Sequence, residues 1–363
     1  MIEKTDNESA KKSIKDIAWN VSEEVYRADN ALSYSTLARF NREGFSKLST
    51  LFDKIESPSL TFGSAVDTII TDGMDAFKAK FMVAKFDASD QICQYAKLVF
   101  DFFYPQDKDE YKTLNNVPDD KLADFLTDNG YQLNWKKETR ARVFKEKASD
   151  YYRSLADANR RTVIDSNTYT DVTRCCDALK TSVATKFYFN NDAFDTNIEN
   201  VYQLKFKATF NDIDYRCMPD LLIVNHENKT ILPIDLKTSS HEEWDFPKSF
   251  VQWNYQIQAR LYWRIIERNI KNDAYFKDFT LLDYLFIVVN RKTITPLVWN
   301  FDYTQSYGCI RIRRFDDSFI MLKDPFDIGT ELHNYLTKAH SVPNDIKLNE
   351  PNSIIEFINS TCQ

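Results

Sequence analysis

Two short hydrophobic runs separated by a turn carry the pattern that most restricts what this chain can fold into. The first run, Tyr215–Val224, contains Pro219-Asp220, and the second, Thr230–Leu236, leads directly into Lys237. Their composition predicts β-strands, and the polar residues 225–229 between them predict a turn. If the two strands are antiparallel neighbours, Asp220 and Asp235 meet at one edge of a sheet. Lys237 lies two residues beyond Asp235 and therefore faces the same side.

Two carboxylates and an ammonium group around one point suit a hard divalent cation. Mg²⁺ prefers oxygen ligands and keeps several water molecules, and we expect Mn²⁺ to substitute for it. The lysine would orient the attacking water and stabilise the negative charge that develops on a phosphoryl group. The pattern therefore predicts metal-assisted hydrolysis of phosphodiester bonds, with Asp220, Asp235 and Lys237 as the catalytic residues.

Two similar patterns elsewhere in the chain serve as controls. Pro118-Asp119 lies in a polar loop without a suitably spaced partner, and Glu227-Asn228-Lys229 occupies the turn itself. Only the set formed by Asp220, Asp235 and Lys237 has strand-like sequence on both sides. The alternative interpretation is a pair of surface aspartates with an incidental lysine.

The surrounding periodicity predicts a sheet packed against helices. Val201–Phe210 alternates apolar and polar residues, so it predicts a third strand in a meander with the two runs above. Two further strands are expected at 282–289 and 293–300, and a closing helix at 327–338. A long helix from Pro247 to Arg268 would pack on the sheet through Trp253, Ile257, Leu261 and Ile265.

The segment from residue 31 to about residue 73 is expected to be helical. Ser33 or Ser35 would cap a helix, and a second helix would follow Ser57-Pro58 and end near Gly73. Gly63 inside this second helix predicts close packing against another backbone. The expected division is an N-terminal arm over 1–30, a core over 31–74 and 195–345, and a mostly helical insertion over 75–194.

Three polar residues after the Asp-Leu-Lys run are further candidates. Gln258 and Tyr262 are four residues apart beside the apolar stripe, where they would reach a phosphate or brace Lys237. Ordinary packing at the border of the helix is the alternative for both. Thr238 either donates to a phosphate or only turns the chain toward the helix.

In this order and spacing, Pro219-Asp220, Asp235-Leu236-Lys237 and Gln258 to Tyr262 resemble the PD-(D/E)XK nucleases, in particular the RecB-like branch with its Q-x-x-x-Y helix. Ser33 to Leu37 and Phe62 to Asp67 resemble the two N-terminal helices of the RecE (exonuclease VIII) and phage group. The resemblance covers about residues 31–73 and 200–265. It implies an α/β, restriction-endonuclease-like core, a mixed central sheet flanked by helices, with a helical insertion.

The resemblance also implies an activity and a ligand set. The expected function is an exonuclease on linear double-stranded DNA in recombination or DNA processing. The alternatives are an endonuclease of the same superfamily and a catalytically impaired DNA-binding or scaffolding protein. The Leu236 backbone carbonyl and Asp67 would add metal ligands, and Gln258, Tyr262 and Thr238 would support the site or contact a phosphate. A single-strand annealing or recombination protein, or further copies of the chain, would be partners.

The chain departs from these relatives at two positions. Asp67 stands where they commonly have a histidine, and the strand before Pro219 carries Gln203 and no carboxylate before Asp212. Oxygen suits Mg²⁺ at least as well as nitrogen does, so the first change is chemically tolerable. The second removes a fourth acidic ligand, which is the best support for a catalytically impaired protein.

The charge of the chain leaves room for DNA binding only where basic residues cluster. The net charge is −7, whereas proteins that bind DNA through phosphate neutralisation alone are usually basic. Lys136, Lys137 and Arg140 form one basic block, and Arg311 and Arg313 share a face of a strand-like run. Contact with the DNA backbone and an ordinary solvated surface are equal alternatives for both.

Several cofactors and locations are not expected. There is no P-loop and no G-x-G-x-x-G, so no nucleotide is predicted. The positions of Cys93, Cys309 and Cys362 do not supply an iron–sulfur cluster. The polar N-terminus and the absence of long apolar runs predict neither a leader peptide nor a membrane span. A cytoplasmic location in a bacterial or phage-infected cell fits the low cysteine content.

Overall fold

A mixed sheet forms the centre of the computed structural model, which describes residues 11–53, 55–189, 196–313 and 317–338. Its strands run in the order β10-β9-β7-β6-β3, and β8 pairs with the start of β7. β7 is parallel to β9, whereas β3–β6, β6–β7 and β9–β10 are antiparallel. The bounds are β3 (Ile198–Tyr202), β6 (Leu221–Asn225), β7 (Thr230–Ser239), β8 (Thr280–Leu281), β9 (Tyr284–Asn290) and β10 (Leu297–Phe301).

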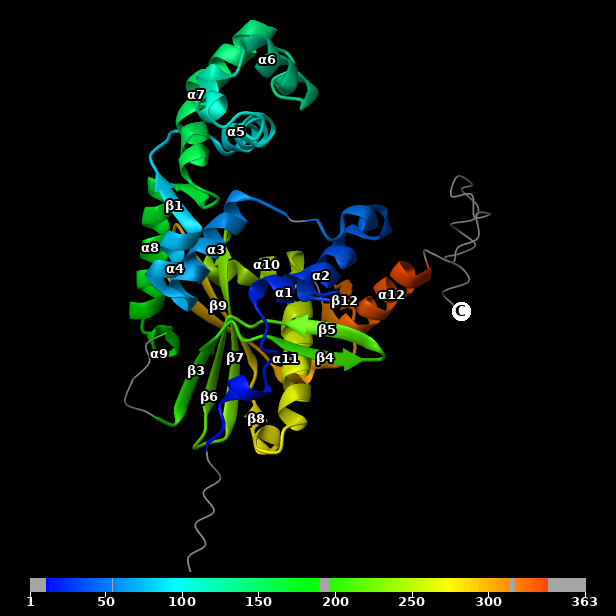
Figure 1. Ribbon diagram of the computed structural model, residues 1–363. Coiled ribbons are helices and arrows are strands. Elements are labelled where there is room, and N and C mark those ends of the chain that lie inside the picture. Colours follow the sequence, from blue (N-terminus) through cyan, green and yellow to red (C-terminus); the bar gives the residue numbers. More distant parts are fainter. Residues whose placement is uncertain (1–10, 54, 190–195, 314–316, 339–363) are drawn as a thin grey trace, which may run out of the picture.

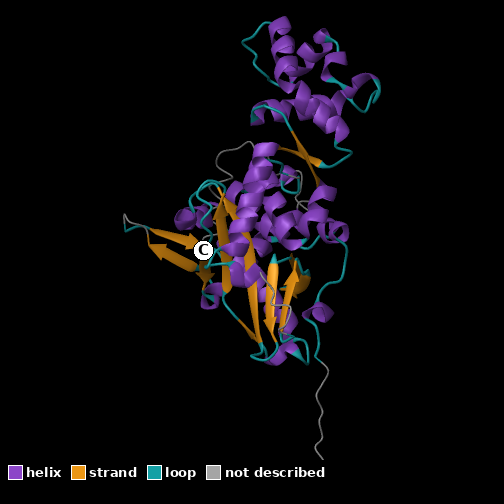
Figure 2. Ribbon diagram, turned by 90° about the vertical axis from the view of Figure 1, so that its left-hand side faces the viewer, coloured by secondary structure: helices purple, strands orange, loops and turns teal. Residues whose placement is uncertain are grey.

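Helices cover both faces of this sheet (Figures 1 and 2). Because successive strand residues point to opposite faces, the buried residues of β7 and β9 divide between two cores. One core joins Ile231 and Phe286 to α11 (Tyr255–Lys271), and the other joins Ile234 and Ile287 to α3 (Pro58–Thr71) and α8 (Ser166–Thr181). The predicted α/β class with a mixed sheet flanked by helices is confirmed, and this arrangement is consistent with the predicted restriction-endonuclease-like core.

The predicted meander of three strands is wrong in its connections. The run 201–210 splits at Gln203, which has a positive φ of 48°, into β3 and β4 (Phe206–Phe210). The run 215–224 splits around Pro219 into β5 (Ile213–Cys217) and β6, as expected for a residue without a ladder donor. β4 and β5 form a separate hairpin, and β3 pairs with β6.

The predicted helix from Pro247 to Arg268 is two helices. α10 (Phe246–Gln252) ends before Trp253, and α11 begins after Asn254, which has a left-handed backbone conformation. Ile257, Leu261 and Ile265 pack in the core as predicted. Trp253 does not, since its side chain is 44% exposed.

The N-terminal helices lie where the sequence predicts them. Ser33 caps α2 (Tyr34–Glu43), and Ser57 caps α3 with Pro58 at its first position. Within the expected arm over residues 1–30, the described part from residue 11 packs against the core. Ile14 is buried, and Leu32 just beyond the arm pairs with Tyr215 of β5. This N-terminal part includes η1 (Ile14–Ile17), α1 (Glu23–Ala28) and η2 (Phe45–Thr50).

The insertion carries a helical lobe that rises above the sheet (Figure 1). Its helices α5, α6 and α7 enclose a core of their own, built from residues between Ile92 and Val163. The parallel pair β1–β2 connects the lobe to the rest of the molecule. The bounds are α4 (Gly73–Lys80), β1 (Phe81–Ala84), α5 (Asp90–Phe103), η3 (Glu110–Lys112), η4 (Leu114–Asn116), α6 (Asp119–Asp128), α7 (Lys137–Asp157), β2 (Thr162–Asp165) and α9 (Lys186–Phe189).

The last described part contains a two-stranded hairpin and a helix that packs against α11. The closing helix begins two residues earlier than predicted, at Pro325. No helix among the described residues is long and apolar enough to span a membrane. The remaining bounds are η5 (Glu243–Asp245), η6 (Phe276–Asp278), η7 (Tyr303–Ser306), β11 (Ile310–Arg313), β12 (Phe319–Leu322) and α12 (Pro325–Lys338).

Candidate functional site

The end of β7 creates the place where the predicted site residues meet. Pairing between β6 and β7 stops at Leu221 and Ile234, while β7 continues beside β9 as far as Ser239. Asp220 lies immediately before β6, and its Oδ2 accepts a hydrogen bond of 2.7 Å from the backbone N–H of Leu236. The carboxyl of Asp220 thus takes the position that the next residue pair of the ladder would occupy.

Asp235 and Lys237 lie on the same side of β7, as their spacing predicts. The Nζ of Lys237 forms an ion pair with Oδ2 of Asp235. From α11, the amide of Gln258 donates a hydrogen bond to Oδ1 of the same carboxylate. Gln258 is buried, and its hydrogen bond goes to Asp235 and not to Lys237.

Asp67 joins this group from the opposite face of the sheet. It lies on α3, one turn after Gly63, and its Oδ2 accepts a hydrogen bond of 2.9 Å from Gln203. A Cβ built on Gly63 would lie 2.9 Å from Oγ1 of Thr238. Gly63 therefore permits the close approach of α3 to β7 that the sequence predicts, although the nearest atom belongs to a side chain and not to the backbone.

The pKa of each of the three carboxyl groups is raised, and the charge of Asp235 contributes to the shifts of the other two. Burial, together with the charge of Asp235, raises the pKa of Asp67 to about 7. Burial also raises the pKa of Asp220 well above its usual value, with further contributions from Asp235 and Asp67. Burial raises the pKa of Asp235, although Lys237 opposes it. Three carboxyls thus share the positive charge of one lysine, an arrangement that favours binding of an additional cation.

Aromatic rings surround Lys237 on its other sides. Its Nζ lies 4.8 Å from the centroid of the Tyr255 ring and 6.0 Å from that of Phe286. Burial alone would lower the pKa of Lys237, but the charge of Asp235 and its other acidic neighbours raise it. The ammonium form is therefore the stable one. Tyr284 lies beside Asp235 and acts to lower the pKa of that carboxyl.

Sequence reasoning did not identify Tyr34, Tyr255 and Tyr284 as neighbours of the site. Tyr255 lies one helical turn before Gln258, so the helical spacing was a usable signal for it. Tyr34 and Tyr284 come from α2 and β9, whose positions beside β7 depend on the tertiary fold. Tyr262, which was predicted, is buried with its ring 6.3 Å from that of Tyr284.

The donor set fits a hydrated divalent cation. Within the described ranges, Oδ1 of Asp67 and Oε1 of Gln258 are buried and have no hydrogen-bond partner. Asp235 is buried, whereas Asp67, Asp220 and Lys237 each keep a small exposed fraction. No three acidic, histidine or cysteine side chains among the described residues enclose an ion by themselves. An ion here would complete its shell with water and backbone oxygen, which is common for Mg²⁺.

The basic residues predicted as DNA contacts lie outside the cluster of acidic residues and Lys237. Arg140 is 3% exposed and donates to the carbonyls of Gln132, Leu133 and Trp135, so its prediction as a DNA contact is wrong. A guanidinium inside a fold binds carbonyl oxygens because it loses its water there. Lys137 pairs with Asp124. Lys136 is exposed, as are Arg311, which stacks on Phe319, and Arg313, which pairs with Asp317.

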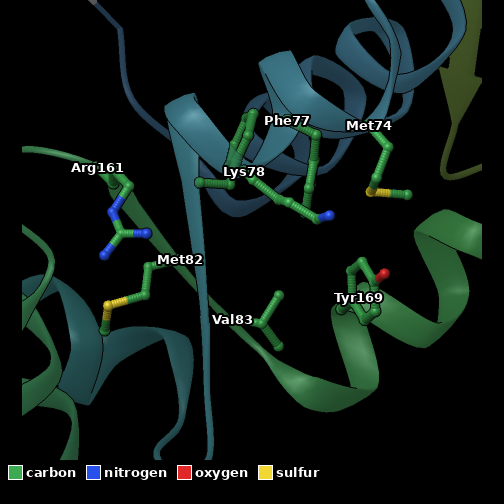
Figure 3. A pocket seen from close by; sticks show the side chains of 8 residues that line it. Met74, Phe77, Lys78, Met82, Val83, Arg161 and Tyr169 are labelled. Atoms are coloured by element: carbon green, nitrogen blue, oxygen red, sulfur yellow. The ribbon is translucent and has the colours of Figure 1, made fainter.

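A separate pocket of about 320 Å³ lies where α4, β1 and α8 meet below the lobe (Figure 3). Lys78, Arg161 and Tyr169 line it together with apolar residues such as Phe77. None of the predicted site residues belongs to it. The pocket is therefore distinct from the cluster formed by Asp67, Asp220 and Asp235.

Comparisons with known proteins identify no family for this chain. No family model matches the chain, and no curated protein matches it. Among solved structures, it is similar to one from Eubacterium rectale that bears the name "putative exonuclease". That likeness has a TM-score of 0.41 and 12% sequence identity, and it covers 93% of this chain and 97% of the other. At this distance, the neighbour's name carries no conclusion about the activity of this chain.

Proposed function

We propose that this chain is a Mg²⁺-dependent deoxyribonuclease of the PD-(D/E)XK type. The observation that carries the proposal is the meeting of Asp220, Asp235 and Lys237 at the end of β7, where the carboxyl of Asp220 replaces a strand partner. The sequence order of these residues and the mixed sheet that positions them both support it. Among members of that superfamily, an exonuclease acting on linear double-stranded DNA fits the N-terminal motifs best.

Asp220 and Asp235 would hold the metal, with Asp67 as a third carboxylate. The backbone N–H and C=O of one strand residue point to the same side. The Leu236 carbonyl therefore faces the side on which its N–H meets Asp220. A bound divalent ion supplies Lewis-acid activation of water and neutralises charge on the phosphate.

Lys237 and Gln258 have different roles in this proposal. Lys237 stays protonated beside Asp235 and stabilises negative charge as it develops on the scissile phosphate. Gln258 fixes the orientation of Asp235 by its hydrogen bond to Oδ1. Thr238 packs against Gly63 and so contributes to the position of α3. Tyr262 supports the site from the core.

A catalytically impaired DNA-binding protein is the second candidate, and one observation favours it. Gln203 lies beside Asp67, where relatives commonly place an acidic residue, and its amide donates to that carboxyl. An amide supplies no charge, so this site would hold its metal less tightly than a four-carboxylate site would.

The deciding experiment compares linear and circular DNA in Mg²⁺ or Mn²⁺. We expect loss of linear DNA with intact circles. Nicked or linearised circles would instead identify an endonuclease. Asp235→Asn should lower the rate by at least about 100-fold, because one ligand and the partner of Lys237 are lost together. Asp101→Asn, an exposed change in the lobe, is the matched control. Absence of cleavage by the wild type in either metal would contradict the nuclease proposal.

A further inference from the structure

Trp253 lies at the break between α10 and α11. Asn254 has φ 56° and ψ 41°, a left-handed conformation that asparagine tolerates better than most residues. It is 8% exposed, and its Oδ1 accepts a hydrogen bond of 3.1 Å from Asn41 of α2. The break is therefore fixed by a contact between two elements that are far apart in the sequence.

The break removes a large aromatic ring from the core. In a continuous helix, Trp253 would share a face with Ile257 and Leu261, which are both fully buried. Instead, 44% of Trp253 is exposed. Burying an indole is strongly favourable, so core stability does not account for this placement.

Neighbouring polar groups hold the exposed Trp253 in one position. The guanidinium of Arg42 lies 5.4 Å from the centre of the indole, and Arg42 also donates to the Trp253 carbonyl at 3.4 Å. The hydroxyl of Tyr34 donates to the same carbonyl at 2.9 Å. Arg42 and Tyr34 both lie on α2, which packs against α11.

Tyr34 links the backbone of Trp253 to the candidate site, because the ring whose hydroxyl donates to the Trp253 carbonyl also packs near Tyr255. The centroid of the Tyr34 ring is 6.3 Å from that of Tyr255, and the Tyr255 ring is 4.8 Å from Nζ of Lys237. Arg42 places positive charge beside the indole, and Lys237 beside the Tyr255 ring. A partly exposed indole with a cation beside it is a usual means of binding an unpaired base and its phosphate.

We infer that Trp253 is a stacking platform for an unpaired nucleobase of the strand that is cut, next to the scissile phosphate. This inference rests on the proposed function and names its substrate as a strand with an unpaired base at the cleavage point. Arg42 supports the indole from one side and attracts the phosphate backbone. Trp253 thus acts as a positioning residue that contributes to substrate binding and not to bond cleavage.

The first test is tryptophan fluorescence during titration with a single-stranded thymidine oligonucleotide in Ca²⁺, which is chosen to prevent cleavage. The chain has six tryptophans, and stacking should quench Trp253 in particular. Trp253→Phe should lose most of the quenching and bind nearly as well as the wild type. Trp253→Ala should weaken binding by about tenfold or more. Phe102→Ala, an exposed aromatic change in the lobe, should change neither.

The second test replaces single bases of the oligonucleotide with abasic sites. At one position beside the cleavage point, the abasic site should weaken binding to the wild type by about the factor caused by Trp253→Ala. The same abasic site should then cost the alanine variant nothing further, because the two changes remove one contact. In cleavage assays, the variant should show a raised KM with kcat little changed.

The outcomes separate the inference from the proposed function. If the wild type cleaves and Trp253→Ala matches it in binding and KM, the stacking role is wrong while the nuclease stands. If the abasic penalty persists in the alanine variant, the base lies elsewhere. A wild type that neither binds nor cleaves DNA overturns both. If Trp253→Ala fails to fold, the phenylalanine variant and the wild-type abasic series still decide.

Discussion

The fold of the metal-free protein opposes ionisation of Asp67. Its carboxyl is held near Asp235 and Asp220, and burial raises its pKa to about 7. A carboxyl with a raised pKa in the folded state contributes stability below its unfolded value of about 4, and this is lost as the pH rises toward 7. The metal-free protein should therefore lose stability across that interval.

Asp67→Asn should remove this loss. In metal-free buffer at pH 8, we expect the variant to be more stable than the wild type by about 1–3 kcal/mol, with the difference vanishing below pH 4. Added Mg²⁺ should stabilise the wild type more than the variant. Denaturant unfolding at several pH values measures both effects, with Asp101→Asn as the control. A variant less stable than the wild type at pH 8 would show that Asp67 is stabilised by its neighbours.

The sequence was most informative about which single residues meet at the candidate site. Asp220, Asp235 and Lys237 could be predicted because strand periodicity fixes which side chains share a face. Gln258 could be predicted as a neighbour, but its partner could not, because the rotation of α11 over the sheet is set by core packing. Arg140 shows the opposite error, since a basic side chain can be buried wherever loop carbonyls surround it.

At the scale of elements, the position of α3 over β7 depends on Gly63. Alanine is favoured over glycine inside a helix by about 1 kcal/mol. At this position, however, its Cβ would meet Thr238 Oγ1 at 2.9 Å, so either the Thr238 side chain or α3 must shift. We expect α3 to shift, and Asp67, one turn further along α3, would move with it.

Gly63→Ala should therefore separate stability from function. We expect the melting temperature to change little, because the gain in helix propensity offsets the contact. Metal affinity and cleavage should fall by about tenfold or more, since displacement of a ligand by a fraction of an ångström is sufficient. Calorimetric Mg²⁺ binding measures this, and Ser64→Ala on the exposed side of α3 is the control. Undiminished metal binding would mean that Asp67 is not a ligand.

Arg260 connects three elements at a buried point. From α11, it donates to the carbonyls of Lys323 and Gly308 and pairs with Asp324 just before α12. Arg260→Leu should destabilise the protein by about 2–4 kcal/mol, because buried acceptors lose their partner. Arg27→Leu, in an exposed pair with Glu23, should cost less than about 1 kcal/mol. Equal losses in denaturant unfolding would contradict the structural role of Arg260.

The boundaries of elements were harder to predict than their existence. The pattern of Ile257, Leu261 and Ile265 identified α11, but the break at Asn254 depends on its contact with Asn41, 213 positions earlier. Likewise, the hairpin β4–β5 leaves the main sheet because Gln203 and Pro219 interrupt two runs that read as continuous strands. Local periodicity does not contain such long-range contacts.

At the scale of the whole molecule, the lobe is set apart from the core in packing and in charge. Its apolar residues form a cluster separate from the two cores beside the sheet. Residues 85–161 carry 14 acidic and 14 basic residues, so the lobe has no net attraction for phosphate. The chain enters the lobe at the end of β1 and leaves it at the start of β2, which is parallel to β1.

A variant in which residues 86–160 are replaced by a short Gly/Ser linker should therefore fold. The linker must span a four-residue parallel strand, about 13 Å, so six residues suffice. We expect the variant to unfold cooperatively and to be stabilised by Mg²⁺ as the wild type is. It should cleave short oligonucleotides at a rate within about tenfold of the wild type. The reason is that no described residue of the lobe makes the hydrogen bonds that hold Asp67, Asp220 and Asp235. The full-length chain is the control. Loss of the Mg²⁺ effect in a folded deletion variant would show that the lobe helps to shape the site, and the two bodies would then have to be considered one functional unit.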